Sequence, residues 1–140
     1  MATYCLIIKL NKDSRISVGK IGEYDFKKGF YVYVGSALNS IDARIKRHLR
    51  NEKKLFWHID YLLASSNASI REVILERSPE KWECEIAGKI AVNAFPLIGF
   101  GCSDCKCNSH LFYFESYEET KNLVLNSFNN FKLNSEKFID

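Results

Sequence analysis

Apolar residues in the first part of the chain follow the pattern of β-strands. Residues 3–10 (TYCLIIKL) and 30–35 (FYVYVG) are rich in β-branched and aromatic side chains, a composition typical of strands. Shorter strands are predicted at about 15–18 and 23–26, with glycine-containing turns between them. This order predicts an antiparallel sheet built from sequential hairpins.

After residue 38 the spacing of apolar positions changes to that of a helix. Asn39 or Ser40 can cap a helix that carries Ile41, Ile45 and Leu49 on one side. The rest of the chain alternates between the two element types. It predicts a helix at 54–64, a strand at 69–76, a helix from Ser78-Pro79 to about Ala94, a loop at 97–109, a strand at 110–114 and a helix at 117–128 that starts with a capping box of Ser116 and Glu119.

These elements describe one small α+β domain over residues 1–128, with a mixed or antiparallel sheet flanked by helices. Residues 129–140 are predicted to form a loosely packed C-terminal tail. The length of 140 residues suits a single core. No apolar run approaches the roughly 20 residues of a membrane-spanning helix, and the first residues lack the basic lead-in of a signal peptide. We therefore expect a soluble cytoplasmic protein without a membrane partner.

The net charge of +3 is unevenly distributed along the chain. Between Asp42 and Lys54 six cations stand against two anions, so this segment alone carries +4. A local basic segment in a nearly neutral protein is typical of polyanion binding, although a solvated helix face has the same composition. The candidate contacts to nucleic-acid phosphates are Lys46, Arg47, Arg50, Lys53 and Lys54.

Arg44 and His48 lie one helical turn apart, at the edge of the apolar stripe of the first predicted helix. At about 100° per residue, these two side chains can face one cavity beside the sheet, whereas Lys46, Arg47 and Arg50 point to solvent. A guanidinium held at such an edge can bind a phosphate with two N–H groups. A surface salt bridge for Arg44 and a packed histidine would explain the same pattern.

The helix predicted from Pro79 carries two glutamates near its apolar stripe. Glu85 falls at the rim of that stripe and Glu83 falls close to the stripe itself. A carboxylate near a buried face needs a cation, a hydrogen-bond network or a metal, and Mg²⁺ is typically held by one or two carboxylates plus phosphate oxygens. The alternative is that either glutamate pairs in water with Lys81 or Lys89.

Two strand tyrosines complete a recognisable pattern. Thr3-Tyr4 lies near the start of one predicted strand, Tyr33-Val34-Gly35 ends another, and Arg44-x-x-x-His48 lies on the next helix. On strands, tyrosines ordinarily pack in the core; these two share a site if their strands are neighbours. The arrangement resembles the GIY-YIG nuclease family, whose signature is Gly-Ile-Tyr on one strand, Tyr-Ile-Gly on a neighbour, a helical arginine and a glutamate on a later helix.

The resemblance is more specific to one branch of that family. The segments YVYVGSA, RHLR, KKLFWHIDYLL, ECE and FGCSDCKCNSHLFYF are similar to a small prokaryotic subfamily that occurs alone or fused to DNA-repair glycosylases. The similarity spans about residues 2–115. It implies a DNA-binding, structure-selective endonuclease of repair or recombination, with a DNA-repair enzyme as a possible partner.

The resemblance also implies a metal-assisted mechanism. One Mg²⁺ or Mn²⁺ ion would be held by the glutamate, the arginine would contact the scissile phosphate, and a strand tyrosine with a nearby histidine would position or deprotonate the attacking water. The positions that match these roles are Tyr4, Tyr33, Arg44, His48 and Glu85, with Gly35, Ser36 and Glu83 as accessory candidates.

The chain departs from the family pattern in three places. The first triplet keeps only its tyrosine, residues 11–29 lengthen the gap between the triplets and predict an added hairpin, and the family's late asparagine has only Asn108 as a counterpart. Two alternatives therefore stay open: a non-catalytic nucleic-acid-binding module of the same fold, and a zinc-stabilised interaction domain.

Five cysteines, an odd number, favour reduced thiols over a disulfide framework. Four soft or borderline ligands crowd into the loop before the last predicted strand, where they could form a tetrahedral zinc site or simply pack as small thiols. The set is Cys102, Cys105, Cys107 and His110, with Cys84 as a substitute for one member.

Three further polar residues are accessory candidates. His58 could join the site as a proton-transfer group, although a structural histidine is the more ordinary interpretation. Asp104 and His110 could stand at the mouth of the active site.

Overall fold

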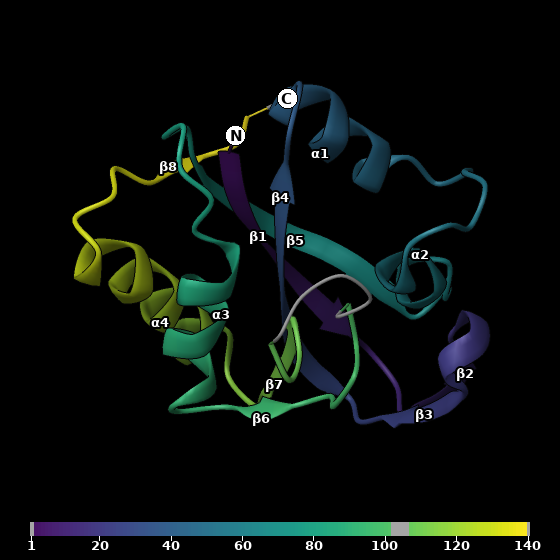
Figure 1. Ribbon diagram of the computed structural model, residues 1–140. Coiled ribbons are helices and arrows are strands. Elements are labelled where there is room, and N and C mark those ends of the chain that lie inside the picture. Colours follow the sequence, from purple (N-terminus) through teal and green to yellow (C-terminus); the bar gives the residue numbers. More distant parts are fainter. Residues whose placement is uncertain (1, 102–106, 140) are drawn as a thin grey trace.

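A six-stranded antiparallel sheet forms the centre of the computed structural model, which describes residues 2–101 and 107–139 (Figure 1). Every strand pair in it is antiparallel, so the antiparallel alternative is confirmed. In spatial order the strands are β6 (Phe95–Pro96), β7 (Leu111–Phe114), β4 (Gly29–Ala37), β1 (Ala2–Leu10), β5 (Ala68–Glu76) and β8 (Glu136–Lys137).

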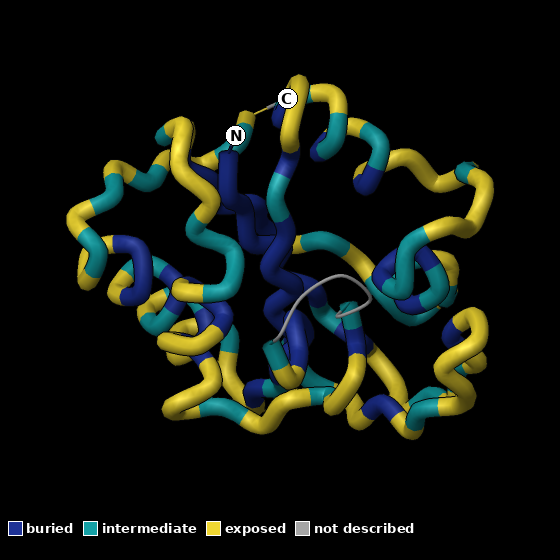
Figure 2. The backbone as a smooth tube through the Cα atoms, in the orientation of Figure 1, coloured by how far each residue is buried: buried dark blue, intermediate teal, exposed yellow. Residues whose placement is uncertain are grey.

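Four helices cover the two faces of this sheet, which makes the predicted single α+β domain a three-layer structure. Alternate residues of β1 serve the two faces: Tyr4 and Leu6 join one apolar cluster, Cys5 and Ile7 the other. Figure 2 shows the buried residues concentrated along the central strands. The first cluster includes residues of α1 (Ile41–Leu49) and α2 (His58–Leu63), and the second includes residues of α3 (Glu83–Ala91) and α4 (Tyr117–Asn130).

The long connection between β1 and β4 forms the added hairpin that the sequence predicts. Strand β2 (Ser14–Ser17), the short 3₁₀ helix η1 (Gly19–Ile21) and strand β3 (Glu23–Phe26) make a separate two-stranded ribbon. The carboxylate of Asp13 accepts a hydrogen bond from the backbone N–H of Lys28 at the base of the ribbon. Val18 and Phe26 are buried in the first apolar cluster, so the ribbon packs on the face that carries α1 and α2.

Two helices start later than their sequence patterns indicate. The helix predicted at 54–64 begins only at His58, because the backbone N–H groups of Phe56 and Trp57 donate to the carboxylate of Asp60 instead of continuing a helix toward the N-terminus. The prediction of a helix start at Ser78-Pro79 is wrong: α3 begins at Glu83, after Trp82 donates its backbone N–H to the hydroxyl of Thr3 on β1.

The C-terminal part is more ordered than the sequence indicates. Helix α4 has the Ser116 half of the predicted capping box, with the Ser116 hydroxyl accepting from the backbone N–H of Glu119. The helix runs on to Asn130. Residues predicted as a loose tail then supply β8, which pairs with β5 and covers its outer edge. The backbone N–H of Phe138 donates to the carbonyl of Val73, and its ring packs against the first cluster.

Within the described ranges, none of the helices has the length and apolar character needed to cross a membrane.

Candidate active site at the edge of strand β4

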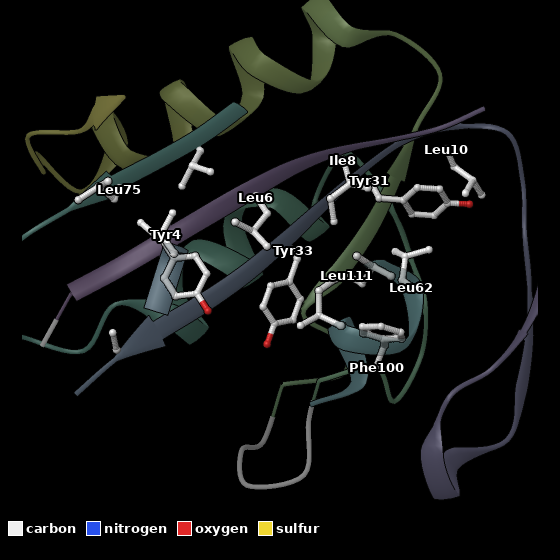
Figure 3. Close-up of a cluster of buried hydrophobic side chains, with 14 of the residues drawn as sticks. Tyr4, Leu6, Ile8, Leu10, Tyr31, Tyr33, Leu62, Leu75, Phe100 and Leu111 are labelled. Atoms are coloured by element: carbon white, nitrogen blue, oxygen red, sulfur yellow. The ribbon is translucent and has the colours of Figure 1, made fainter. Parts of the chain in front are cut away.

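Strand register brings the two predicted tyrosines onto one face of the sheet. Tyr4 of β1 lies opposite Gly35 of β4, and Tyr33 of β4 lies opposite Leu6 of β1. The ring centroids of Tyr4 and Tyr33 are 6.4 Å apart. Figure 3 shows both hydroxyl groups pointing to the same side, away from the sheet. The condition that the sequence left open, neighbouring strands for these tyrosines, is met.

Helix α1 places His48 directly on the Tyr4 hydroxyl. The Tyr4 oxygen and Nε2 of His48 are 2.7 Å apart, and both side chains are buried. Burial lowers the pKa of His48 to about 4, helped by the charges of Lys53, Arg47 and Arg44 and opposed by Asp60. Burial also raises the pKa of Tyr4. These shifts favour a neutral phenol and a neutral imidazole at physiological pH.

Arg44 reaches the edge of the sheet beside this pair. Its Nη1 donates to the backbone carbonyl of Ser36 at 2.9 Å, and its guanidinium lies 4.4 Å from the centroid of Trp57. No carboxylate among the described residues forms an ion pair with Arg44. Its charge is therefore held in place without being neutralised.

Glu83, rather than the predicted Glu85, is the carboxylate that joins this group. The hydroxyl of Ser36 donates to Glu83 Oε1 at 3.4 Å, and Nδ1 of His110 lies 3.4 Å from Glu83 Oε2. Burial is the main cause of the raised pKa values of Tyr4 and Tyr33, and the charge of Glu83 adds to both. Glu85 is exposed to solvent and enters none of these contacts among the described residues.

These side chains meet where β4 runs past the end of its pairing with β7. That pairing covers Phe30 to Tyr33, which leaves the edge at Ser36 open to groups from both faces of the sheet. Arg44 approaches from the α1 side and Glu83 from the α3 side, and Ser36 contacts both. A guanidinium and a carboxylate thus flank one edge, next to two tyrosine hydroxyls and a neutral imidazole.

The basic segment divides into exposed and structural cations. Lys46, Arg50 and Lys54 are exposed, as expected of phosphate contacts. Lys53, by contrast, is partly buried, and its ammonium donates to the carbonyl of His48.

Arg47 does not point to solvent as its helical position predicts. Its guanidinium makes two hydrogen bonds of 2.9 Å to the buried carboxylate of Asp60, lies 4.3 Å from the centroid of Trp57 and donates to the carbonyl of Lys54. Burial acts to raise the pKa of Asp60, but the hydrogen bonds from Arg47 and from the backbone of Phe56 and Trp57 outweigh it and lower that pKa. The guanidinium of Arg47 is therefore engaged within the protein and is not free to contact a phosphate as the sequence predicts.

Asp60 is the important residue that the sequence reasoning left without a role. Its carboxylate is inaccessible to solvent and fixes the segment between α1 and α2, including the ring of Trp57 on which Arg44 rests. A signal was present, because an acidic residue three positions after a helix N-cap is the capping-box position.

His58 has a structural contact. Its Nδ1 accepts a hydrogen bond of 2.8 Å from the backbone N–H of Gly101, and its ring packs edge-on against Phe100. Burial lowers the pKa of His58. The imidazole is therefore neutral, and in this form it holds the start of the cysteine-rich loop in place.

Cys84 and Cys107 are joined as a disulfide, with their Cα atoms 6.1 Å apart. The expectation of reduced thiols throughout is not met for this pair, while Cys5 is a buried free thiol. His110 lies with them: its ligand atom and the two sulfurs are all within 4.8 Å of one another. Three of the predicted loop residues, Cys102, Asp104 and Cys105, lie outside the described residues.

Comparison with known proteins shows which family the chain belongs to. No curated protein and no solved structure matches the chain. A family model matches residues 3–133, which include almost every element described above. That family is described as Domain of unknown function DUF123, and the chain belongs to it.

Proposed function

We propose that the protein is a divalent-metal-dependent endonuclease of the GIY-YIG type that hydrolyses phosphodiester bonds in DNA. The observation that carries the proposal is the convergence of five side chains at one sheet edge. They come from two strands and two helices, and they are Tyr4, Tyr33, Arg44, His48 and Glu83.

The oxygen atoms at this edge fit a small, hard cation. Glu83 offers a carboxylate whose side chain is 13% exposed, and the Ser36 hydroxyl lies beside it. Mg²⁺ is commonly held by one or two carboxylates together with water and phosphate oxygens. When bound, such an ion supplies positive charge to the developing phosphorane and lowers the pKa of a coordinated water.

Arg44 is suited to hold the scissile phosphate. One guanidinium nitrogen is anchored on the Ser36 carbonyl, and the plane is fixed against Trp57. The remaining N–H groups can donate to a phosphate in the bidentate geometry that arginine favours. Because no described carboxylate neutralises Arg44, the full charge is available to stabilise negative charge in the transition state.

Tyr4 and His48 provide a route for the proton of the attacking water. In this proposal the Tyr4 oxygen takes that proton while its own proton moves to Nε2 of His48 along the 2.7 Å hydrogen bond. His48 can accept it because the imidazole is neutral at physiological pH. Tyr33, whose hydroxyl points to the same side, would orient the water.

A non-catalytic nucleic-acid-binding module is the second candidate, and the burial of the tyrosines favours it. Tyr4 is 1% exposed and Tyr33 is 9% exposed, so water and phosphate have little direct access to either ring. In this alternative the exposed cations Lys46, Arg50 and Lys54 bind phosphates, and the tyrosines only pack.

Cleavage assays with two matched glutamate variants distinguish these candidates. Supercoiled plasmid and labelled branched DNA would be incubated with Mg²⁺, Mn²⁺ or EDTA. We expect metal-dependent cutting by the wild type, loss of cutting in Glu83→Gln, and wild-type rates in Glu85→Gln, which changes an exposed residue two positions away on the same helix. Wild-type cutting by Glu83→Gln or by Arg44→Ala would refute the proposed site.

Salt-dependent binding assays complete the design. If no metal supports cutting but the wild type binds DNA with an affinity that falls steeply with salt, the binding module is the correct interpretation. If the protein neither cuts nor binds DNA, both candidates are wrong.

A further inference from the structure

Helix α3 and the segment that leads into β7 bring two cysteines and a histidine together next to Glu83. Cys84 is the second residue of α3, and Cys107 and His110 precede β7. One potential ligand atom from each residue lies within 4.8 Å of the other two. Twenty-three residues separate the two cysteines in sequence, so the fold, and not a short local motif, assembles the cluster.

We propose that Cys84, Cys107 and His110 form a zinc-binding site in the reduced protein. Two thiolates and one imidazole are the donor set that Zn²⁺ prefers. With Zn–S and Zn–N bonds of about 2.0–2.3 Å, the ligand atoms of a tetrahedral ion stand about 3.3–3.8 Å apart. All three ligand atoms lie within 4.8 Å of one another. Once the disulfide is reduced, the two sulfurs must move apart from bonding distance to the tetrahedral spacing to bind the ion.

The disulfide is the competing state of the same site. Zinc binding requires that a dithiol reductant first converts the Cys84–Cys107 disulfide into two thiols, with the reductant itself oxidised to its disulfide. The two thiols then release two protons as their sulfurs bind Zn²⁺. The protein can therefore hold a disulfide or a metal at this position, but not both.

A groove beside the cluster gives an ion access from solvent. It has a volume of about 430 Å³ and is lined by both cysteines together with Ala87, Gly88, Pro96 and Phe112. The described residues supply three ligands, and a tetrahedral ion takes a fourth, which at an accessible site can be a water molecule or another small ligand. The surrounding apolar side chains favour thiolate–metal bonds, because they limit competing hydration.

The site is coupled to the edge of β4 through His110. The His110 ring lies against Glu83, with Nδ1 3.4 Å from Oε2, and Cys84 follows Glu83 directly on α3. Carboxylates that contact a metal-bound histidine orient its ring. The zinc site requires no nuclease activity, and its test does not depend on the function proposed above.

The test begins with reduced, metal-free protein titrated with Zn²⁺ and, as a spectroscopic probe, Co²⁺. We expect one metal ion per chain and a thiolate-to-cobalt charge-transfer band. Cys84→Ser and Cys107→Ser should each lose stoichiometric binding, whereas Cys5→Ala, which alters the buried free thiol on β1, should bind as the wild type does. Oxidation of the wild type with a thiol oxidant should abolish binding.

Alkylation of the wild type provides a readout that does not rely on variants folding. In the reduced protein, Zn²⁺ should protect Cys84 and Cys107 from alkylation, as read by peptide mass spectrometry. The proposal is overturned if reduced wild type takes up no metal, if Cys84→Ser binds zinc with unchanged affinity and stoichiometry, or if zinc leaves the alkylation of both cysteines unchanged.

Discussion

The ring of Tyr4 occupies the space in which any residue other than glycine at position 35 would carry its Cβ. A Cβ built on Gly35 would stand 2.5 Å from both Cζ and the hydroxyl oxygen of Tyr4, much closer than two unbonded heavy atoms can approach. The backbone of Gly35 is not in a left-handed conformation, so the need for glycine is steric. The glycine that ends the Tyr-Val-Gly triplet is therefore what lets the Tyr4 hydroxyl reach His48.

Gly35→Ala should displace Tyr4 and weaken its hydrogen bond to His48. We expect a loss of about 1–3 kcal/mol in the free energy of unfolding, typical of an inserted methyl group in a packed core, and a loss of any cleavage activity. Urea unfolding followed by circular dichroism measures the first effect. Gly88→Ala is the matched control: apart from its chain neighbours and its own helix backbone, no described atom lies within 4 Å of the added methyl. An exposed helix position should gain about 0.5–1 kcal/mol. Equal effects of the two changes would contradict the steric role of Gly35.

Arg47→Ala should destabilise the protein far more than loss of an ordinary surface cation. It leaves the buried carboxylate of Asp60 without its charged partner, and breaking a buried pair on one side costs about 3–5 kcal/mol. Because the Arg47 side chain is 21% exposed, we expect the lower end, about 3 kcal/mol. Arg50→Ala, on the exposed side of the same helix end, should stay within about 0.5 kcal/mol. Chemical denaturation of both variants measures the difference, and similar midpoints would show that the Arg47–Asp60 pair is not structural.

His48 should make the fold lose stability as the pH falls below neutral. Burial lowers its pKa to about 4 in the folded protein, against an ordinary value of 6.5 in the unfolded chain. Between these values the unfolded chain binds more protons than the folded one, so the free energy of unfolding increases with pH. The contribution is complete above about pH 6.5 and is lost as the pH falls toward 4, a total of about 3 kcal/mol.

Urea unfolding at a series of pH values isolates this effect. His58 also has a pKa lowered by burial, so the wild type should combine the slopes of two histidines. In His48→Gln the amide can still accept the Tyr4 hydrogen, but the slope of unfolding free energy against pH should become clearly shallower between pH 6.5 and 5. His58→Gln should keep the His48 contribution. An unchanged slope in His48→Gln would mean that this imidazole titrates normally.

The exposed cations should set the salt dependence of DNA binding. Lys46, Arg50 and Lys54 are the exposed members of the predicted basic segment, and each phosphate contact removed should lower the slope of log affinity against log salt by about 1. Alanine at each position tests this by fluorescence anisotropy at several salt concentrations. Lys89→Ala, an exposed lysine on α3, is the control on the other face of the sheet. If the slope of log affinity against log salt changes equally in all four variants, the three cations of the basic segment do not form the DNA-binding face.

Much of the arrangement around Tyr4 could be predicted because it depends on short-range periodicity. Alternation along a strand sends Tyr33 and Gly35 to one face, and i to i+4 spacing on a helix aligns Arg44 with His48. Neither rule needs knowledge of the tertiary fold once the strands are known to be neighbours.

The contacts of a long side chain that folds back toward the protein could not be predicted from helical spacing. Helical spacing gives the direction of the Arg47 Cβ, but the guanidinium folds over Trp57 to reach Asp60, thirteen residues further along the chain. The structure places Glu83 beside Ser36 and leaves Glu85, the residue that the sequence favoured, exposed. This placement was not predictable for a related reason. It depends on where α3 begins, and that start follows a backbone contact with Thr3 on a distant strand. Cysteine pairing, likewise, cannot be deduced from spacing alone.

The central position of β1 in the sheet has a consequence for the order of folding. Tyr4 lies opposite Gly35 of β4 on one side and opposite Leu75 of β5 on the other. Strand β1 must therefore pair with both neighbours before the surroundings of Tyr4 are complete. A nascent or truncated chain that ends before β5 would leave one edge of TYCLIIKL unpaired. Long, weakly charged strand edges of this kind recruit other chains, so aggregation competes with folding until β5 is added.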